Sequence, residues 1–179
     1  MTPAAVGNVI IADDDRMIRS VLQAKLEALG LNVFVTADGM EATGLASRIP
    51  AVLIILDLKM PKLNGLLACE RIREMPCNAR TPIAILTSTH EKSAEVAGLR
   101  AGATAFFTKP FRAPLLLHEL ARFLPISEAL RAAIRRDAER VLEIAQDASK
   151  APDPYESREN NQADSLLKRG KYIIDTLRG

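Results

Sequence analysis

The chain has 179 residues, of which 48% are hydrophobic and 26% are charged, and its formal net charge is +2 at pH 7. This length suits one domain with an extension, and the apolar fraction is sufficient for a buried core. So small a net charge creates no overall field that would attract a nucleic acid or an anionic membrane surface.

The first residues contain no basic region followed by a long apolar run, so we expect no secretory signal. The longest uncharged apolar runs, such as residues 51–56, are too short to cross a bilayer. Cys69 and Cys77 are the only cysteines, and without an export signal two reduced thiols are expected rather than a disulfide. These features predict a cytoplasmic protein with no membrane partner.

Short apolar runs alternate with segments of helical periodicity between residues 9 and 124. In chain order, the predicted strands are 9–12, 32–37, 51–57, 82–87 and 104–109. The predicted helices are 16–29, 40–49, 64–75, 92–102 and 113–124. The pair Asp38–Gly39 is predicted as a turn, and Gly30 as the stop of the first helix.

Five strands that alternate with five helices through short connections predict an α/β fold with a parallel sheet covered on both faces. The run 51–57 shows no polar alternation, which is typical of a central strand buried on both sides. We therefore predict a flavodoxin-like (βα)5 doubly wound sheet with strand order 2-1-3-4-5. Ligands of such sheets bind outside the carboxyl ends of the strands.

Polar residues stand where four of the predicted strands end. They are Asp13, Asp14 and Asp15 after the first strand, Asp57 at the end of the third, Thr87 and Ser88 at the fourth, and Lys109 at the fifth. Converging carboxylates are oxygen ligands of the kind that Mg²⁺ prefers. A carboxylate is also a nucleophile toward phosphorus, and Asp57, alone at the central strand, is the best candidate. Lys109 and Thr87 are suited to binding the oxygens of a transferring phosphoryl group.

Four motifs at these strand ends resemble the receiver domain of two-component response regulators. They are IIADDD (10–15), LDLKMPKLNG (56–65), AILTS (84–88) and FFTKPF (106–111). The resemblance covers residues 8–124, so we assign residues 1–124 to a receiver domain and 125–179 to a helical extension without a recognised output domain. By position, Asp57 matches the phospho-acceptor of that family.

The resemblance also implies a Mg²⁺ site and a switch. Asp13 and Asp14 match the acidic pair, with Asp14 as the direct metal ligand and Asp13 acting through water, and Lys59 contributes its backbone carbonyl. Thr87 matches the switch hydroxyl, Phe106 the switch aromatic, and Lys109 the lysine that pairs with the phosphoryl group. Pro110 matches a Lys–Pro bond that is usually cis in the family.

Some assignments keep two interpretations. Asp15 at a helix start suits an N-cap better than a metal ligand. Phe106 suits either the hydrophobic core or the switch, and His90 and His118 have no partners at metal-ligand spacing. Lys59 and Thr89, each two residues past a site residue, are expected to influence the lifetime of the phosphoryl group, in a direction that the sequence leaves open.

The extension begins with an amphipathic segment, 126–149, predicted as a long helix starting at Ser127. Residues 150–164 are polar and contain two prolines, which indicates a loop, and 165–179 are predicted as a short helix interrupted by Gly170. Residues 125–179 carry ten Lys or Arg and ten Asp or Glu, so DNA binding has little electrostatic support. The extension is expected to dimerise, to pack on the receiver, or to bind a partner.

These features predict a response regulator that accepts a phosphoryl group from a phosphohistidine donor on Asp57, with Mg²⁺. It would signal through the face formed by the fourth helix, fifth strand and fifth helix. Its partners would be a sensor histidine kinase or histidine phosphotransfer protein, and a downstream protein or a second copy. It would be no enzyme beyond its own phosphorylation and dephosphorylation. The alternatives are a phosphate sink or phosphorelay intermediate, a DNA-binding regulator, or a phosphatase of the haloacid-dehalogenase type.

Overall fold

The computed structural model describes residues 7–89 and 92–150 and contains one five-stranded parallel sheet. The strands are β1 (Asn8–Ala12), β2 (Asn32–Thr36), β3 (Leu53–Asp57), β4 (Ile83–Thr87) and β5 (Ala105–Thr108). Their order is β2-β1-β3-β4-β5, with every neighbouring pair parallel. The predicted flavodoxin-like fold is confirmed.

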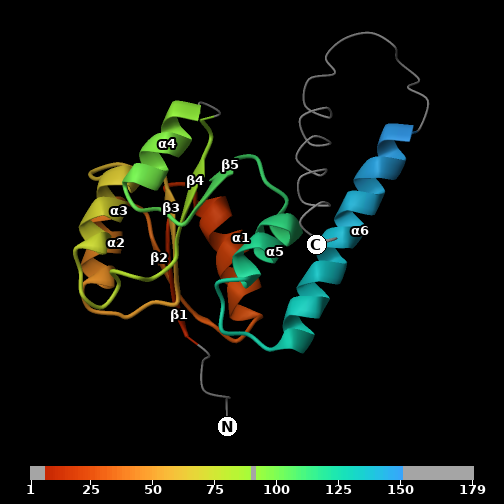
Figure 1. Cartoon of the computed structure of the whole chain (residues 1–179), viewed down its shortest axis with the longest axis horizontal. Helices are drawn as coiled ribbons and strands as arrows, with labels where there is room; N and C mark the ends of the chain where they lie inside the picture. The colour runs from red at the N-terminus through yellow and green to blue at the C-terminus, as the bar shows by residue number, and fades with distance from the viewer. Residues whose placement is uncertain (1–6, 90–91, 151–179) are drawn as a thin grey trace.

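Helices cover both faces of this sheet (Figure 1). They are α1 (Arg16–Glu27), α2 (Gly39–Ala46), α3 (Gly65–Arg73), α4 (Lys92–Arg100), α5 (Ala113–Ala121) and α6 (Glu128–Lys150). Helices α1 and α5 lie on one face, with α2, α3 and α4 on the other, and α6 lies outside α5. Two hydrophobic clusters fill the layers between sheet and helices, one on each face.

Burial explains why two of the strands read as unbroken apolar runs. All five residues of β3 and all five of β4 are buried, because both strands lie inside the sheet with helices on each side. The edge strand β2 has only one buried residue, Thr36. Two of the strands that lead to the predicted site, β3 and β4, therefore lie in the closely packed interior of the fold.

The predicted bounds differ from the structure mainly at helix ends. The turn predicted at Asp38–Gly39 is wrong, because Asp38 is the N-cap of α2 and accepts a hydrogen bond from the Glu41 N–H, so the helix already begins at Gly39. Gly30 and Gly102 follow α1 and α4 with φ angles of 82° and 91°, the left-handed conformation that glycine adopts most readily. Strand β3 begins at Leu53, two residues later than predicted.

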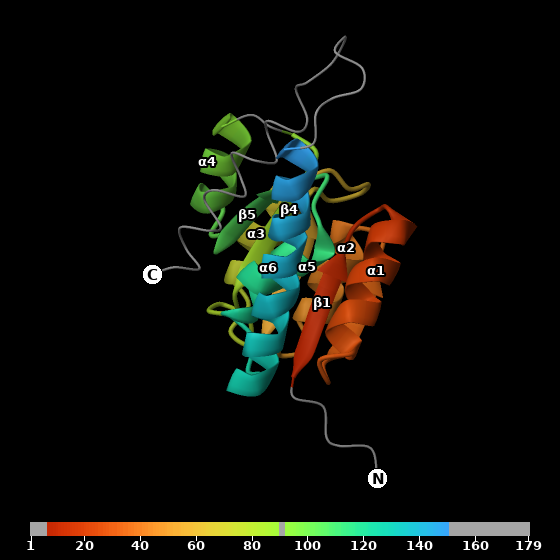
Figure 2. The same ribbon diagram turned by 90° about the vertical axis from the view of Figure 1, so that its right-hand side faces the viewer.

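The helix predicted over 126–149 is confirmed as α6, which packs along α5 (Figure 2). Ile134, Ala138 and Leu142 are buried, at four-residue spacing on one side of α6. Of the three roles expected for the extension, the structure shows packing on the receiver. The helix predicted over 165–179 lies outside the described residues, and the boundary at residue 124 stays a prediction.

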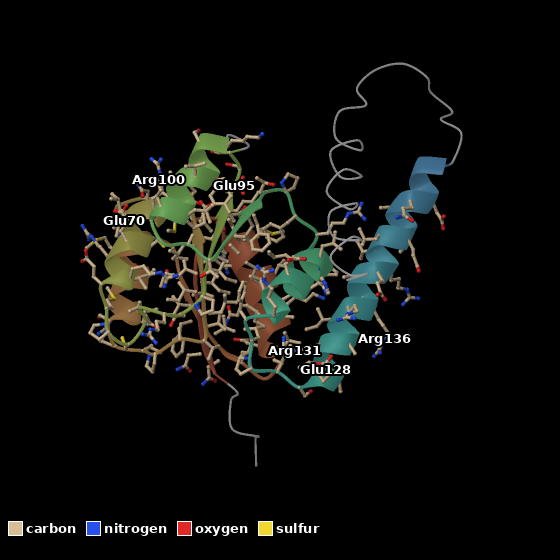
Figure 3. The ribbon with its side chains drawn as sticks, in the orientation of Figure 1. Glu70, Glu95, Arg100, Glu128, Arg131 and Arg136 are labelled. Carbon is tan, nitrogen blue, oxygen red and sulfur yellow. The ribbon has the colours of Figure 1, made fainter. Side chains whose placement is uncertain are left out.

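An arginine fastens α6 to the end of α5. Arg131 donates from its two terminal nitrogens to the carbonyls of Ala121 and Leu124, which terminate α5 and the turn after it. Figure 3 shows Arg131 on the side of α6 toward α5 and Arg136 on the outer side. The guanidinium thus satisfies carbonyls that a helix end leaves without partners.

Among the described helices, none combines the length and the apolarity that a membrane crossing requires.

Candidate functional site

Three carboxylates meet at the carboxyl ends of β1 and β3. Asp13 directly follows β1 and Asp57 ends β3, and these strands are neighbours in the sheet. With Asp14, their ligand oxygens all lie within 4.8 Å of one another. Asp13 and Asp57 are buried, and Asp14 is exposed. The donors are all carboxylate oxygens, and one carboxylate faces solvent, so the site fits a hard cation such as Mg²⁺.

Lys109 joins two of these carboxylates. Its Nζ lies 2.6 Å from Asp13 Oδ2 and 3.0 Å from Asp57 Oδ1. The residue directly follows β5, and its N–H donates to the Thr87 carbonyl, continuing the β4–β5 pairing. The bond from Lys109 to Pro110 is cis, as the resemblance implies. Lys109 thus provides a positive charge in the same group of side chains.

Burial and charge shift the pKa values of this pair. Burial raises the pKa of Asp57, and the negative charges of Asp13 and Asp14 add to that effect, while the hydrogen bond and charge of Lys109 oppose it. Burial lowers the pKa of Lys109, but its hydrogen bonds to Asp13 and Asp57 outweigh burial, so its pKa is raised. Lys109 is therefore a fixed cation, and Asp57 is a carboxylate whose charged form depends on nearby positive charge.

The backbone after β3 holds Asp57 in place. The Lys59 N–H donates to Asp57 Oδ2 at 3.2 Å, and the Leu58 N–H donates to the Leu86 carbonyl of β4. A Cβ on Gly65 would collide with the Asp57 carbonyl, so glycine permits α3 to begin directly against the end of β3. In the same loop, Lys62 has a φ of 62° and pairs with Asp38, the cap of α2, at 2.5 Å. The loop in the motif LDLKMPKLNG is therefore held by a backbone hydrogen bond to β4 at its start and by an ion pair with the cap of α2 further along.

The three aspartates that follow β1 have different partners. Asp15 is the N-cap of α1 and accepts hydrogen bonds from the N–H groups of Met17 and Ile18, which confirms the cap that its position predicted. Asp13 accepts from the Asp15 N–H through Oδ1 and binds Lys109 through Oδ2. Both Asp13 oxygens therefore have protein partners, as both Asp57 oxygens do, and the expected water-mediated metal contact of Asp13 stays a prediction.

The two predicted switch residues lie on the neighbouring strands. Thr87 ends β4, is fully buried, and accepts a hydrogen bond from the Thr89 N–H through Oγ1. Phe106 lies on β5 and packs against the cluster under α3 and α4, where Gly98 leaves space for its ring. The structure therefore places Phe106 in partial contact with the core, and its switch role stays a prediction. His118 lies on α5, and His90 lies outside the described residues.

One residue at the site was not predicted. Arg19, on the first turns of α1, donates from Nη1 to the carbonyls of Asp13 at 2.6 Å and Asp14 at 3.0 Å. A basic residue in an amphipathic helix gives no sequence signal for such a contact, because the contact depends on how the loop folds back on the helix.

The open side of the site is hollowed. A cavity of about 710 Å³ adjoins the exposed carboxylate of Asp14. Its other lining residues come from the loop after β3 and the start of α3, and they are Leu58, Lys59, Met60, Pro61, Asn64 and Leu66.

Comparisons with known proteins agree with this geometry. The profile of the family described as "Response regulator receiver domain" matches residues 9–121. The alkaline phosphatase synthesis transcriptional regulatory protein PhoP of Bacillus subtilis is 37% identical over 103 residues, which cover 58% of this chain and 42% of that protein. The chain thus spans less than half of that relative's length.

Two solved structures share the fold over about two thirds of the chain. Chemotaxis protein CheY4 of Vibrio cholerae has a TM-score of 0.63 at 32% identity and covers 67% of this chain and 100% of its own. The receiver domain of sensor histidine kinase PA1611 from Pseudomonas aeruginosa has a TM-score of 0.61 at 30% identity, covering 66% and 98%. That structure contains a magnesium ion in its active-site cleft.

Proposed function

The chain belongs to the response regulator receiver-domain family, and we propose that it accepts a phosphoryl group on Asp57 from a phosphohistidine donor. The observation that carries this proposal is the position of the Asp57 carboxylate. It lies at the end of the central strand, bound by Lys109 at 3.0 Å and grouped with Asp13 and Asp14. A buried nucleophile between a fixed cation and a cation-binding group is the arrangement that phosphoryl transfer requires.

In this proposal the residues that would hold Mg²⁺ are Asp14, Asp57 and the backbone carbonyl of Lys59, with Asp13 acting through water. When bound, the metal supplies positive charge that offsets the charge on the phosphoryl oxygens. Its contact with Asp57 would also favour the charged carboxylate, which is the nucleophilic form.

The transfer exchanges one bond to phosphorus for another. An oxygen of Asp57 forms the new O–P bond while the N–P bond of the phosphohistidine breaks, and the bonding electrons leave with the histidine nitrogen. Lys109 and the hydroxyl of Thr87 bind phosphoryl oxygens, which requires Lys109 to exchange part of its contact with Asp57 for the new group. Hydrolysis of the aspartyl phosphate by water would end the signal. Because both reactions take place on the chain's own Asp57, the chain would be no enzyme beyond its own phosphorylation and dephosphorylation.

The proposed output is a contact with a downstream protein or a second copy, made on the face of α4, β5 and α5. Movement of Thr87 toward the phosphoryl group and a shift of Phe106 would alter this face. Among the described residues, helix α6 packs on α5, so α4 is the more accessible part of this face. Val96 and Leu99 on α4 are 48% and 55% exposed, and large exposed apolar side chains are suited to a protein contact.

The other candidates have less support. A phosphate sink or phosphorelay intermediate would use the same site and differ only in its partners. A DNA-binding role has in its favour that the PhoP relative is a transcriptional regulatory protein, but the chain covers 42% of that protein. A phosphatase of the haloacid-dehalogenase type is expected to carry its nucleophile at the end of the first strand, whereas the best-placed nucleophile here, Asp57, ends the third.

Labelling with a phosphoryl donor tests the proposal. The full chain, incubated with Mg²⁺ and acetyl phosphate or a phosphorylated histidine kinase, is expected to gain one acid-labile phosphoryl group. The variant Asp57→Asn should gain none, and the wild type should not turn over p-nitrophenyl phosphate. Labelling that persists in Asp57→Asn, or catalytic turnover of the monoester, would exclude the proposed function.

A further inference from the structure

We propose that Arg19 is a positioning residue, which sets the carboxylates of Asp13 and Asp14 for a divalent cation by binding the backbone between them. This inference rests on the proposed function only in that it assigns the cation to the phosphoryl-accepting site. Among the residues that the structure describes, the guanidinium of Arg19 forms no ion pair with a carboxylate. It donates instead to two successive carbonyls, those of Asp13 and Asp14.

Binding two successive carbonyls fixes the orientation of the peptide between them. Nη1 lies 2.6 Å from the Asp13 oxygen and 3.0 Å from the Asp14 oxygen, so both carbonyls turn toward α1. With the backbone held in this way, the side chains of the same two residues place their carboxylate oxygens within 4.8 Å of the Asp57 carboxylate. A planar guanidinium with fixed donors suits this better than a flexible ammonium.

Asp14 is the residue that gains most from this restraint. Asp13 is already held through both side-chain oxygens, by the Asp15 N–H and by Lys109. Asp14 is exposed, and the peptide after it is held on both sides, by Arg19 at the Asp14 carbonyl and by Asp13 at the Asp15 N–H. Groups that orient metal ligands without touching the metal commonly change metal affinity by about 10- to 100-fold when they are removed. In this proposal Arg19 is such an orienting group for Asp14.

Arg16 provides a matched control for charge. It lies one turn earlier on α1, is exposed, and carries the same charge. Replacing either arginine by alanine removes one positive charge from the start of α1. Only the replacement of Arg19 also removes the bonds to the two carbonyls.

The test is the affinity of the full chain for Mn²⁺, as a spectroscopic substitute for Mg²⁺, in wild type, Arg19→Ala, Arg19→Lys and Arg16→Ala. We expect Arg19→Ala to raise the dissociation constant about tenfold, and Arg19→Lys to raise it by less. Arg16→Ala should remain close to the wild type. At saturating Mg²⁺ the phosphorylation rate of Arg19→Ala should approach that of the wild type, because the nucleophile and Lys109 are intact.

Equal dissociation constants for Arg19→Ala and Arg16→Ala would overturn the inference, as would a rate that stays low at saturating Mg²⁺ in a folded variant. Thermal unfolding without metal shows whether each variant is folded. If Arg19→Ala does not fold, Arg19→Lys decides: a dissociation constant equal to that of the wild type overturns the inference. Failure of the wild type to become phosphorylated would contradict the proposed function, whereas the metal titration would still test Arg19.

Discussion

The carboxyl edge of the sheet and the contact between α5 and α6 are built by opposite means. At the sheet edge, charged side chains are brought together from distant parts of the chain, such as Lys109 and Asp13, 96 residues apart. Between α5 and α6, neighbouring helices bury apolar side chains such as Ile134, and one arginine satisfies the carbonyls of a helix end. The charged cluster at the sheet edge contributes little to the stability of the fold, because burying charges costs free energy. The α5–α6 contact stabilises the fold, because it removes apolar surface from water.

This difference predicts which property each region controls. Substitutions at the sheet edge should remove phosphorylation with little loss of fold. Substitutions at the α5–α6 contact should reduce stability and leave the chemistry intact in the folded fraction.

The largest effect is expected at Asp14. The variant Asp14→Ala removes the exposed carboxylate of the three, so Mg²⁺-dependent phosphorylation should fall below detection while the unfolding midpoint changes little. Phosphate labelling and thermal unfolding of the same samples check both statements. Wild-type labelling in Asp14→Ala would remove Asp14 from the proposed cation site.

Ile134 tests the other region. It is 7% exposed on the side of α6 that faces α5, so Ile134→Ala should lower the free energy of unfolding by about 2–5 kcal/mol. The control is Ile144→Ala on the same helix, where the side chain is 61% exposed and the change should be within about 0.5 kcal/mol. Chemical denaturation measures both, and equal effects would show that α6 does not pack as described.

The third prediction tests whether the adjacent residues Asp14 and Asp15 have different roles, one as a metal ligand and the other as a helix cap. Its side chain caps α1, so Asp15→Ala should cost about 1 kcal/mol of stability while phosphorylation at saturating Mg²⁺ is retained. Denaturation and labelling of Asp15→Ala beside Asp14→Ala make the comparison. If both variants lose labelling alike, Asp15 belongs to the site and the division of the triplet is wrong.

The smallest effect is expected at His118, on α5 beside α6. Burial lowers the pKa of His118, and the positive charge of Arg135 adds to that effect. The negative charges of Glu119 and Glu139 act in the opposite direction but do not outweigh burial. The unfolded chain therefore binds the proton more readily, and stability present above the unfolded pKa of about 6.5 is lost as the pH falls. Between about pH 7.5 and pH 5.5 the wild type should lose more stability than His118→Gln. Equal pH dependence in the two proteins would contradict this.

Much of the sheet edge could be predicted from the sequence, because an apolar run shows where a buried strand ends and the next residue is then the site residue. The structure places Asp57 and Thr87 at the ends of β3 and β4 and Asp13 and Lys109 directly after β1 and β5, and it brings Asp13, Asp57 and Lys109 together. The turn at Asp38–Gly39 was wrong because aspartate and glycine suit both turns and helix starts.

The contacts of two arginines could not be predicted. Arg19 and Arg131 both donate to backbone carbonyls, and nothing in a helical pattern indicates which carbonyls a guanidinium will reach. The position of α6 was equally open, since an apolar stripe shows that a helix is covered but not by what. These features depend on tertiary packing.

The binding of beryllofluoride to the full chain in the presence of Mg²⁺ tests the central claim most directly, because this group mimics a phosphoryl group on a carboxylate. We predict one bound beryllofluoride per chain, detected by fluorine NMR, dependent on Mg²⁺ and absent in Asp57→Asn. A folded wild-type chain that binds none, or binds it equally well as Asp57→Asn, would contradict the assignment of Asp57 as the phospho-acceptor.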